Sequence, residues 1–210
     1  MNASASVATR VALAVRGVLP RGQLLDPEVW ERRHRGIVIV LWLHAAGLTL
    51  FGVVRGFGVA HTIQDASLVA VLAMLAGQPT GSRRLRASAA VLGLVVASAV
   101  LVHLSGGATE AHFHFFVVVG IITLYQDWVP FGLALAFVVV HHGLLGVLHP
   151  TSVYDQPAAW RNPWKWALIH GVFVLAASVT TWSPGGSPSG RRPRSAGWSA
   201  ASRGWPEPTR

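Results

Sequence analysis

Apolar residues in this chain are gathered into long blocks that short polar turns separate. A helix needs about 20 residues, with a range of about 17–25, to cross the hydrocarbon core of a bilayer, so blocks of this length predict membrane spans. The second and fourth blocks are short by that measure, and a five-span fold without the second is the chief alternative. We predict six spans, at residues 36–56, 62–77, 87–104, 110–125, 129–148 and 164–182.

The segment before the first block is polar and basic. Within it, Asp26, Pro27 and Glu28 mark a helix start, because Asp is a favoured N-cap, Pro fits the first helical position and an acid suits the first turn. Residues 29–35 suit the cytoplasmic headgroups, since Trp and Arg favour that interface. We therefore predict an all-α polytopic membrane protein with three parts: a basic segment with an interfacial helix (1–35), a six-helix membrane domain (36–182) and a disordered basic tail (183–210).

Arginine positions predict the orientation. The N-terminal segment and the turn at Arg83–Arg86 are both basic, and two predicted spans separate them, so both are expected on the cytoplasmic side. Six spans then place both ends of the chain inside, in a multi-pass fold of the bacterial inner membrane. Arg161 and Lys165, near the outer side, run weakly against the rule. The outer turns in this topology lie near residues 56–61, 105–109 and 149–160.

Composition supports a membrane protein and excludes several other classes. Hydrophobic residues make up 52% of the chain and charged residues only 12%, against about 25% in an average soluble domain. The net charge of +9 comes from arginines that flank the apolar blocks, so no nucleic-acid partner is expected. Cysteine is absent, which excludes disulfides and thiolate metal sites. Because the sequence shows no nucleophile–base pair, phosphate loop or paired carboxylates, we predict that the chain is not an enzyme.

Ten histidines are present, and most fall at one depth in the predicted topology. His34 is placed in the cytoplasm and His44 near the middle of the membrane. Ionisable groups inside a span are costly unless they face the bundle interior or pair with one another, so a shared depth indicates a common use. The outer-leaflet layer contains His61, His103, His112, His114, His141, His142, His149 and His170, with Glu110 beside it.

This layer offers three kinds of chemistry. Neutral imidazoles could bind a metal ion or a haem iron, a His–Glu cluster could sense external pH, or the rings could hydrogen-bond between helices. Helical geometry lets Glu110 meet His114 on one face, and it turns His112 by about 200° away from His114. The candidate metal ligands are His112, His114, His141 and His142, and the ligand- or proton-sensing set adds Glu110, His103 and His170.

Four motifs give the sequence a family resemblance: Glu110–Phe116, Leu124–Phe131, His141–Gly143 and Asn162–Trp166. Across residues 24–182 the chain resembles the N-terminal membrane input region of bacterial signalling proteins. In that family the region precedes diguanylate cyclase (GGDEF) domains, often with EAL domains, histidine kinases or methyl-accepting chemotaxis transducers. The resemblance implies a six-span sensor whose last helix continues into a cytoplasmic signalling helix. Asp127, in the second motif, is expected to cap the inner turn, with a signalling role as the alternative.

No output module follows the sixth predicted span, where the family has one. We hypothesise that a frameshift after Trp182 truncated a longer protein, because a shifted reading can give a helix with a basic inner boundary; a genuine disordered basic tail is the alternative. The prediction is a membrane-embedded sensory input domain, expected to be a homodimer in the lipid bilayer, whose stimulus the sequence does not identify. The alternatives are a small membrane transporter and a haem- or metal-binding membrane protein that uses the histidines.

Overall fold

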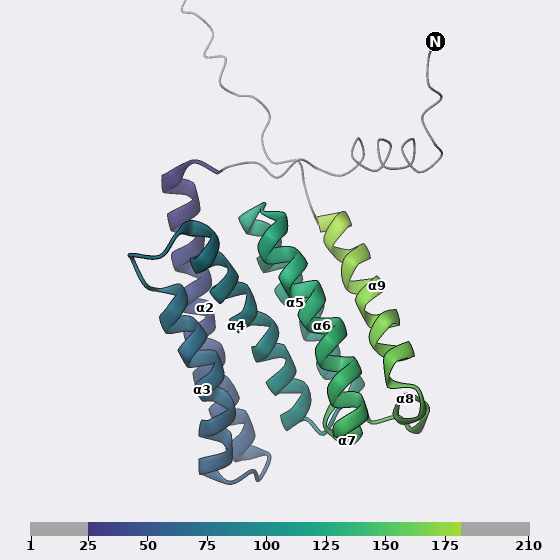
Figure 1. Ribbon diagram of the computed structural model, residues 1–210. Helices are drawn as coiled ribbons and strands as arrows, with labels where there is room; N and C mark the ends of the chain where they lie inside the picture. The colour runs from purple at the N-terminus through teal and green to yellow at the C-terminus, as the bar shows by residue number, and fades with distance from the viewer. Residues whose placement is uncertain (1–24, 182–210) are drawn as a thin grey trace, which may run out of the picture.

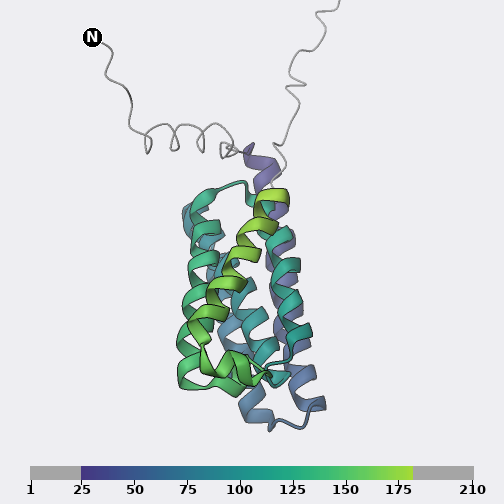
Figure 2. The same ribbon diagram turned by 90° about the vertical axis from the view of Figure 1, so that its right-hand side faces the viewer.

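Each predicted apolar block forms one long helix, and the six helices pack side by side (Figure 1). The computed structural model describes residues 25–181, within which every regular element is helical; the first 24 residues and the predicted tail at 183–210 lie outside it. Successive long helices run in opposite directions, so α2 begins and α9 ends at the same end of the bundle (Figure 1; Figure 2). The long helices are α2 (Pro27–Val54), α3 (Val59–Ala76), α4 (Arg83–Leu104), α5 (Thr109–Ile122), α6 (Trp128–Leu148) and α9 (Pro163–Thr181).

Of the helices that the structure describes, four are long and apolar enough to cross a membrane: α2, α3, α4 and α6. The apolar segment Thr109–Tyr125, which comprises α5 and the 3-10 turn η1 (Thr123–Tyr125), is shorter. The five-span alternative omits the block that forms α3, yet α3 is one of the four. The all-helical, membrane-like fold is thus confirmed, while six spans and cytoplasmic termini stay predictions.

Helix α4 is the centre of the bundle. In the most apolar 18-residue stretch of α4, 72% of the residues are buried, whereas 22–33% are buried in the corresponding stretches of α2, α3 and α6. It packs against α2 and α3 on one side and against α5 and α6 on the other (Figure 1). Small buried residues, among them Ala90, Gly93, Ala97 and Ser98, let the neighbouring backbones approach it closely.

Helix α2 begins at Pro27, directly after Asp26, as the sequence predicts. The Asp26 side chain makes no capping hydrogen bond; its carbonyl oxygen instead accepts one from the Trp30 N–H at 2.9 Å. The helix runs unbroken through residue 35, so the predicted interfacial helix and the first span form one helix of 28 residues. Helix α9 likewise begins at a proline, Pro163, because a missing N–H costs nothing at the first helical position.

Asp127 caps the turn between η1 and α6. Its Oδ1 accepts a hydrogen bond from the Val129 N–H at 2.9 Å, and its Oδ2 lies 3.5 Å from Nε of Arg84 at the start of α4. Gln126, just before it, reverses the chain in a left-handed conformation with a φ of 51°. The capping interpretation of Asp127 is therefore confirmed.

A clamp of side chains closes the end of the bundle where α2 begins. The Arg86 guanidinium donates two hydrogen bonds to the Glu31 carboxylate, at 2.9 and 3.0 Å, and lies 5.1 Å from the ring centroid of Trp30. The planar fork of arginine matches a carboxylate in two-point contacts of this kind. The pair ties α2 to α4 at this end.

His34, expected in the cytoplasm, is buried inside the same clamp, with 1% of its surface exposed. Its Nε2 donates to the Ala76 carbonyl oxygen at 2.9 Å, and its Nδ1 accepts from the Tyr125 hydroxyl at 2.7 Å. The ring also stacks on Trp30, with the centroids 4.6 Å apart. Both ring nitrogens are thus satisfied by groups at the end of α3 and in η1.

The predicted outer loop at 149–160 contains two short helices, α7 (Pro150–Val153) and α8 (Pro157–Arg161). Each begins at a proline, whose fixed φ suits the first turn. Between them, Tyr154 accepts a hydrogen bond at its carbonyl oxygen from the Trp160 indole N–H at 2.7 Å. This contact holds the segment folded across the end of the bundle.

Helices α6 and α9 approach closely at Gly143. A Cβ added at Gly143 would overlap the ring of Trp164, whereas one added at Gly132, in the same helix, would meet nothing within 4 Å. We expect Gly143→Ala to destabilise the bundle by about 1–3 kcal/mol, as overpacking does. Gly132→Ala is the matched control and should hold or slightly raise stability, because alanine favours helix. Equal thermal midpoints for both variants, followed by circular dichroism in detergent, would contradict this packing.

Candidate functional site

Three imidazoles from three helices meet at the end of the bundle opposite the clamp. They belong to His112 in α5, His142 in α6 and His170 in α9, and we call them the three-histidine cluster. Their ring centroids lie 5.3 Å apart for His112 and His142, 5.7 Å for His112 and His170, and 4.9 Å for His142 and His170. Phe115 packs edge-on against two of the rings, so the cluster has an apolar floor.

Main-chain carbonyls fix the tautomer of two of these rings. His112 Nδ1 lies 3.0 Å from the Ala108 carbonyl oxygen, and His142 Nδ1 lies 2.8 Å from that of Val138. A carbonyl oxygen can only accept, so in each neutral ring Nδ1 carries the hydrogen and Nε2 carries a lone pair.

The Nε2 atoms of all three rings are buried, and none has a hydrogen-bond partner within the described part of the chain. Buried polar atoms in folded proteins are normally paired. In His112 and His142 the unpaired atom is the one left with a lone pair. Such a cluster is suited to a ligand that supplies a hydrogen-bond donor or a metal ion.

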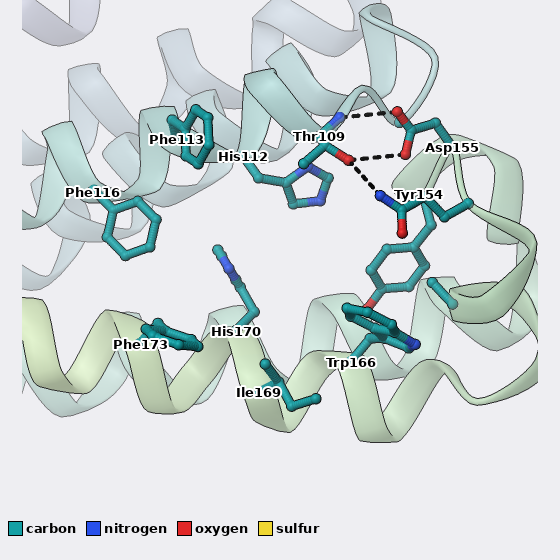
Figure 3. A pocket seen from close by; sticks show the side chains of 13 residues that line it. Thr109, His112, Phe113, Phe116, Tyr154, Asp155, Trp166, Ile169, His170 and Phe173 are labelled. Carbon is teal, nitrogen blue, oxygen red and sulfur yellow. Dashed lines mark hydrogen bonds between the residues drawn. The ribbon is translucent and has the colours of Figure 1, made fainter.

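A cavity of about 330 Å³ opens beside the cluster, between α5, α9 and the outer loop (Figure 3). His112, His170 and Tyr154 project toward it, and Tyr154 lies parallel to the His112 ring with the centroids 6.1 Å apart. Phe113, Phe116 and Phe173 line the far part of its wall. Ligand sites in proteins are mostly apolar and measure about 300–1,000 Å³, so this one suits a compact ligand.

Asp155 fastens the outer loop to the start of α5 beside the cavity. Its carboxylate accepts hydrogen bonds from the Thr109 N–H at 3.2 Å and the Thr109 hydroxyl at 3.0 Å (Figure 3). Next to it, burial raises the pKa of Tyr154 to about 12, so its hydroxyl stays protonated. That hydroxyl donates to the His142 carbonyl oxygen at 3.3 Å. The loop thereby contributes a fixed wall to the cavity.

His114 belongs to a different group of side chains. Its Nε2 lies 3.1 Å from Nε2 of His44, and its Nδ1 lies 2.8 Å from the Ser98 hydroxyl. His44 Nδ1 donates to the Val40 carbonyl oxygen at 2.7 Å, so its Nε2 must accept from His114. This chain satisfies both rings, which favours a hydrogen-bonding role between α2, α4 and α5 over a ligand role.

His141 points away from the three-histidine cluster. Its ring stacks on Phe137 with the centroids 5.2 Å apart and lines a second cavity, of about 280 Å³, together with His103 and His149. Its centroid is 5.3 Å from that of His142, and its Nδ1 is buried without a hydrogen-bond partner. His141 therefore borders the cluster from the neighbouring space between helices.

The predicted metal set of His112, His114, His141 and His142 is brought together only in part. His112 and His142 meet, His141 borders them, and His170 takes the place expected of His114. Glu110 is exposed in the first turn of α5, and no hydrogen bond joins it to His114 within residues 25–181. His103 shares the second cavity with His141, but its Nε2 lies beside His61 and Asp65.

Sequence reasoning missed Tyr154 and Asp155, which lie in a loop without a periodic pattern, and Thr109, the first residue of α5. It also left His44 without a role, although the depth of that residue in a span was a signal that it has a partner.

The two kinds of buried histidine should differ in what they contribute to stability. His34→Leu removes the acceptor of the Tyr125 hydroxyl and leaves the Ala76 carbonyl with only its 3.4 Å hydrogen bond from Arg86 Nε, and we expect it to cost about 1–3 kcal/mol. His170→Leu removes a buried Nε2 atom that has no hydrogen-bond partner in the described part of the chain, so it should be neutral or stabilising. Chemical unfolding of both variants in detergent checks this. Equal losses of stability would show that His170 is needed for the fold itself.

Among known proteins, the chain is similar to the transducer protein Htr8 of Halobacterium salinarum. The two are 38% identical over 187 residues, which cover 82% of this chain and 29% of Htr8. The chain thus spans less than a third of that relative's length. No protein-family model and no solved structure matches the chain. The similarity links these membrane-like helices to a signal-transducing protein.

Proposed function

We propose that this chain is the membrane-embedded sensory input region of a signal transducer, and that its stimulus binds at the three-histidine cluster. The observation that carries the proposal is the set of three buried Nε2 atoms, from three helices, that have no hydrogen-bond partner among residues 25–181. Two of these rings, His112 and His170, line the cavity, and His142 lies directly behind them. The similarity to a transducer supports signalling rather than transport.

Transport across the membrane finds less support in the structure. A path for protons or metal ions would need accessible polar groups along the whole depth of the bundle. At the end opposite the cluster, His34 is paired on both ring nitrogens and Arg86 is joined to Glu31. The polar groups there hold the helices together.

The chemistry of the cluster limits the kinds of ligand that could be the stimulus. A lone pair on a neutral imidazole takes either a hydrogen-bond donor or a borderline transition metal, including haem iron. A compact ligand that fills the cavity beside His112 and His170 would reach both rings. A bound ligand would give a buried imidazole nitrogen the partner that it lacks in the free protein. The free energy of that new interaction would favour the ligand-bound conformation.

Helix α9 is the element that would carry the response. It holds His170 near the cluster and ends at Thr181, at the other end of the bundle (Figure 1). Trp164, in its first turn, packs closely against Gly143 of α6, and in this proposal α9 shifts as one rigid rod. In this proposal the rod leads to a cytoplasmic output of kinase, cyclase or chemotaxis type, and two copies of the chain act as a homodimer.

Sidedness can be tested with single cysteines, because the chain has none of its own. Thr80 lies in the turn between α3 and α4, and Thr151 lies in the outer loop; both are exposed. In intact cells a membrane-impermeant maleimide should label Thr151→Cys and spare Thr80→Cys. Permeabilised cells should label both. The reverse pattern in intact cells would put the cluster on the cytoplasmic side and remove its access to external stimuli.

Signalling can be tested in a chimera that replaces the matching part of Htr8 with residues 1–181. The chimera is challenged with Zn²⁺, Cu²⁺ and steps of external pH, and the transducer's output is followed. We expect a response that His112→Ala, His142→Ala and His170→Ala each abolish, because each removes one ligand nitrogen. His149→Ala, an exposed histidine at the same end, is the matched control and should respond normally. Unchanged responses in the cluster variants would exclude the cluster from sensing.

A further inference from the structure

We propose that His61, Asp65 and His103 form a separate binding site for a divalent transition-metal ion of the zinc class, between α3 and α4. This site goes beyond the proposed function, because it shares no residue with the three-histidine cluster. Among the described residues, these three are the group of histidine and acidic side chains whose ligand atoms all lie within 4.8 Å of one another.

The spacing of the three ligand atoms matches a tetrahedral site. Nε2 of His61 lies 3.3 Å from Nε2 of His103 and 3.3 Å from Oδ2 of Asp65, and Nε2 of His103 lies 3.8 Å from the same oxygen. Ligands that bind Zn²⁺ at about 2.0–2.2 Å in a tetrahedron stand about 3.3–3.5 Å apart, since the edge is about 1.6 times the bond length. Two of the three edges already have that length.

The donor set also fits this class of ion. Two imidazole nitrogens and one carboxylate oxygen are the ligands of many zinc sites, and a water molecule completes the fourth position. A hard ion such as Mg²⁺ or Ca²⁺ would instead require oxygen ligands.

Hydrogen bonds among His61, Asp65 and His103 cannot provide a partner for every polar atom of the three side chains. If His61 donates its Nε2 hydrogen to Nε2 of His103, the lone pair of that second ring is used, and nothing is donated to Asp65. The Asp65 Oδ2 atom is buried and has no hydrogen-bond partner within the described part of the chain, despite its distance to the two rings. A cation between the three atoms satisfies all of them at once.

Local structure holds the three side chains in place and leaves them accessible. His61 and Asp65 are four residues apart on α3 and therefore share one face, while His103 lies in the last turn of α4. The Phe57 ring stacks on His61 with the centroids 5.4 Å apart and lies 6.0 Å from His103. The side chains of His61, His103 and Asp65 are 47%, 36% and 22% exposed, so an ion can enter from water.

An ion bound here would fasten α3 to α4. Neither helix contributes a residue to the wall of the cavity of about 330 Å³ beside the three-histidine cluster. The site would therefore stabilise the frame against which α5, α6 and α9 are packed.

The test uses the full chain, purified in detergent through a tag without histidines. Titration with Co²⁺ should give the strong visible absorption of a four-coordinate ion at one equivalent, and Zn²⁺ should displace it. Zn²⁺ should also raise the thermal midpoint, since it binds only the folded state. We expect His61→Ala and His103→Ala each to weaken binding by more than about 10-fold, because even outer-shell changes at metal sites cost about 10–100-fold.

Control variants distinguish metal binding at His61, Asp65 and His103 from binding elsewhere in the protein. Asp65→Asn keeps the shape of the side chain and removes its charge, so it should weaken binding without unfolding the chain. His149→Ala should bind as the parent does, because His149 belongs to neither proposed site. No binding at one equivalent, or binding unchanged by His61→Ala and Asp65→Asn, would overturn the proposal. Binding lost only in His112→Ala/His142→Ala would assign the ion to the three-histidine cluster and overturn it equally.

Discussion

A buried imidazole in this bundle needs a hydrogen-bond or metal partner for each ring nitrogen. The histidines differ in whether the protein itself supplies those partners. Lipid offers no hydrogen bonds, so pairing has to come from the protein or from a ligand. His34 finds both partners within the fold, and His44 and His114 satisfy each other with the help of Ser98. The three-histidine cluster is left with Nε2 atoms that no group in residues 25–181 pairs. His141, at the border of the cluster, likewise has a buried Nδ1 without a partner among those residues. The presence or absence of partners, rather than depth alone, therefore separates the histidines that hold helices together from those proposed to bind a ligand.

The sequence predicted the helices well, because their ends are encoded locally. Proline at positions 27 and 163 starts α2 and α9, and Asp127 caps α6 through its own side chain. The outer loop was predicted less well. Its two short helices depend on the contact of Trp160 with the Tyr154 carbonyl, and neither residue belongs to a periodic pattern.

The sequence predicted the depth of the candidate-site histidines in the membrane, but not the direction in which each side chain points. Hydropathy places His112, His114 and His170 at one level, yet only the rotation of each helix in the bundle decides which rings meet. Close packing of α6 and α9 brings His170 to His142, and α5 turns His114 toward His44 instead. His34 shows the same limit over a longer distance, because its partner Tyr125 lies 91 residues away in the chain. Such pairings follow from packing and not from spacing.

The two proposed sites divide the bundle about α4. Helix α4 is buried along most of its length and packs against helices on both sides. On one side, α2 and α3 are joined to it by the Arg86–Glu31 contact at one end and by the His61, Asp65 and His103 group at the other. On the other side, α9 lies at the edge, and its main neighbours are α6 and α5. Under the proposed function, a ligand at the three-histidine cluster would shift α9 against α4 and its neighbours, and that shift would be the signal passed along α9.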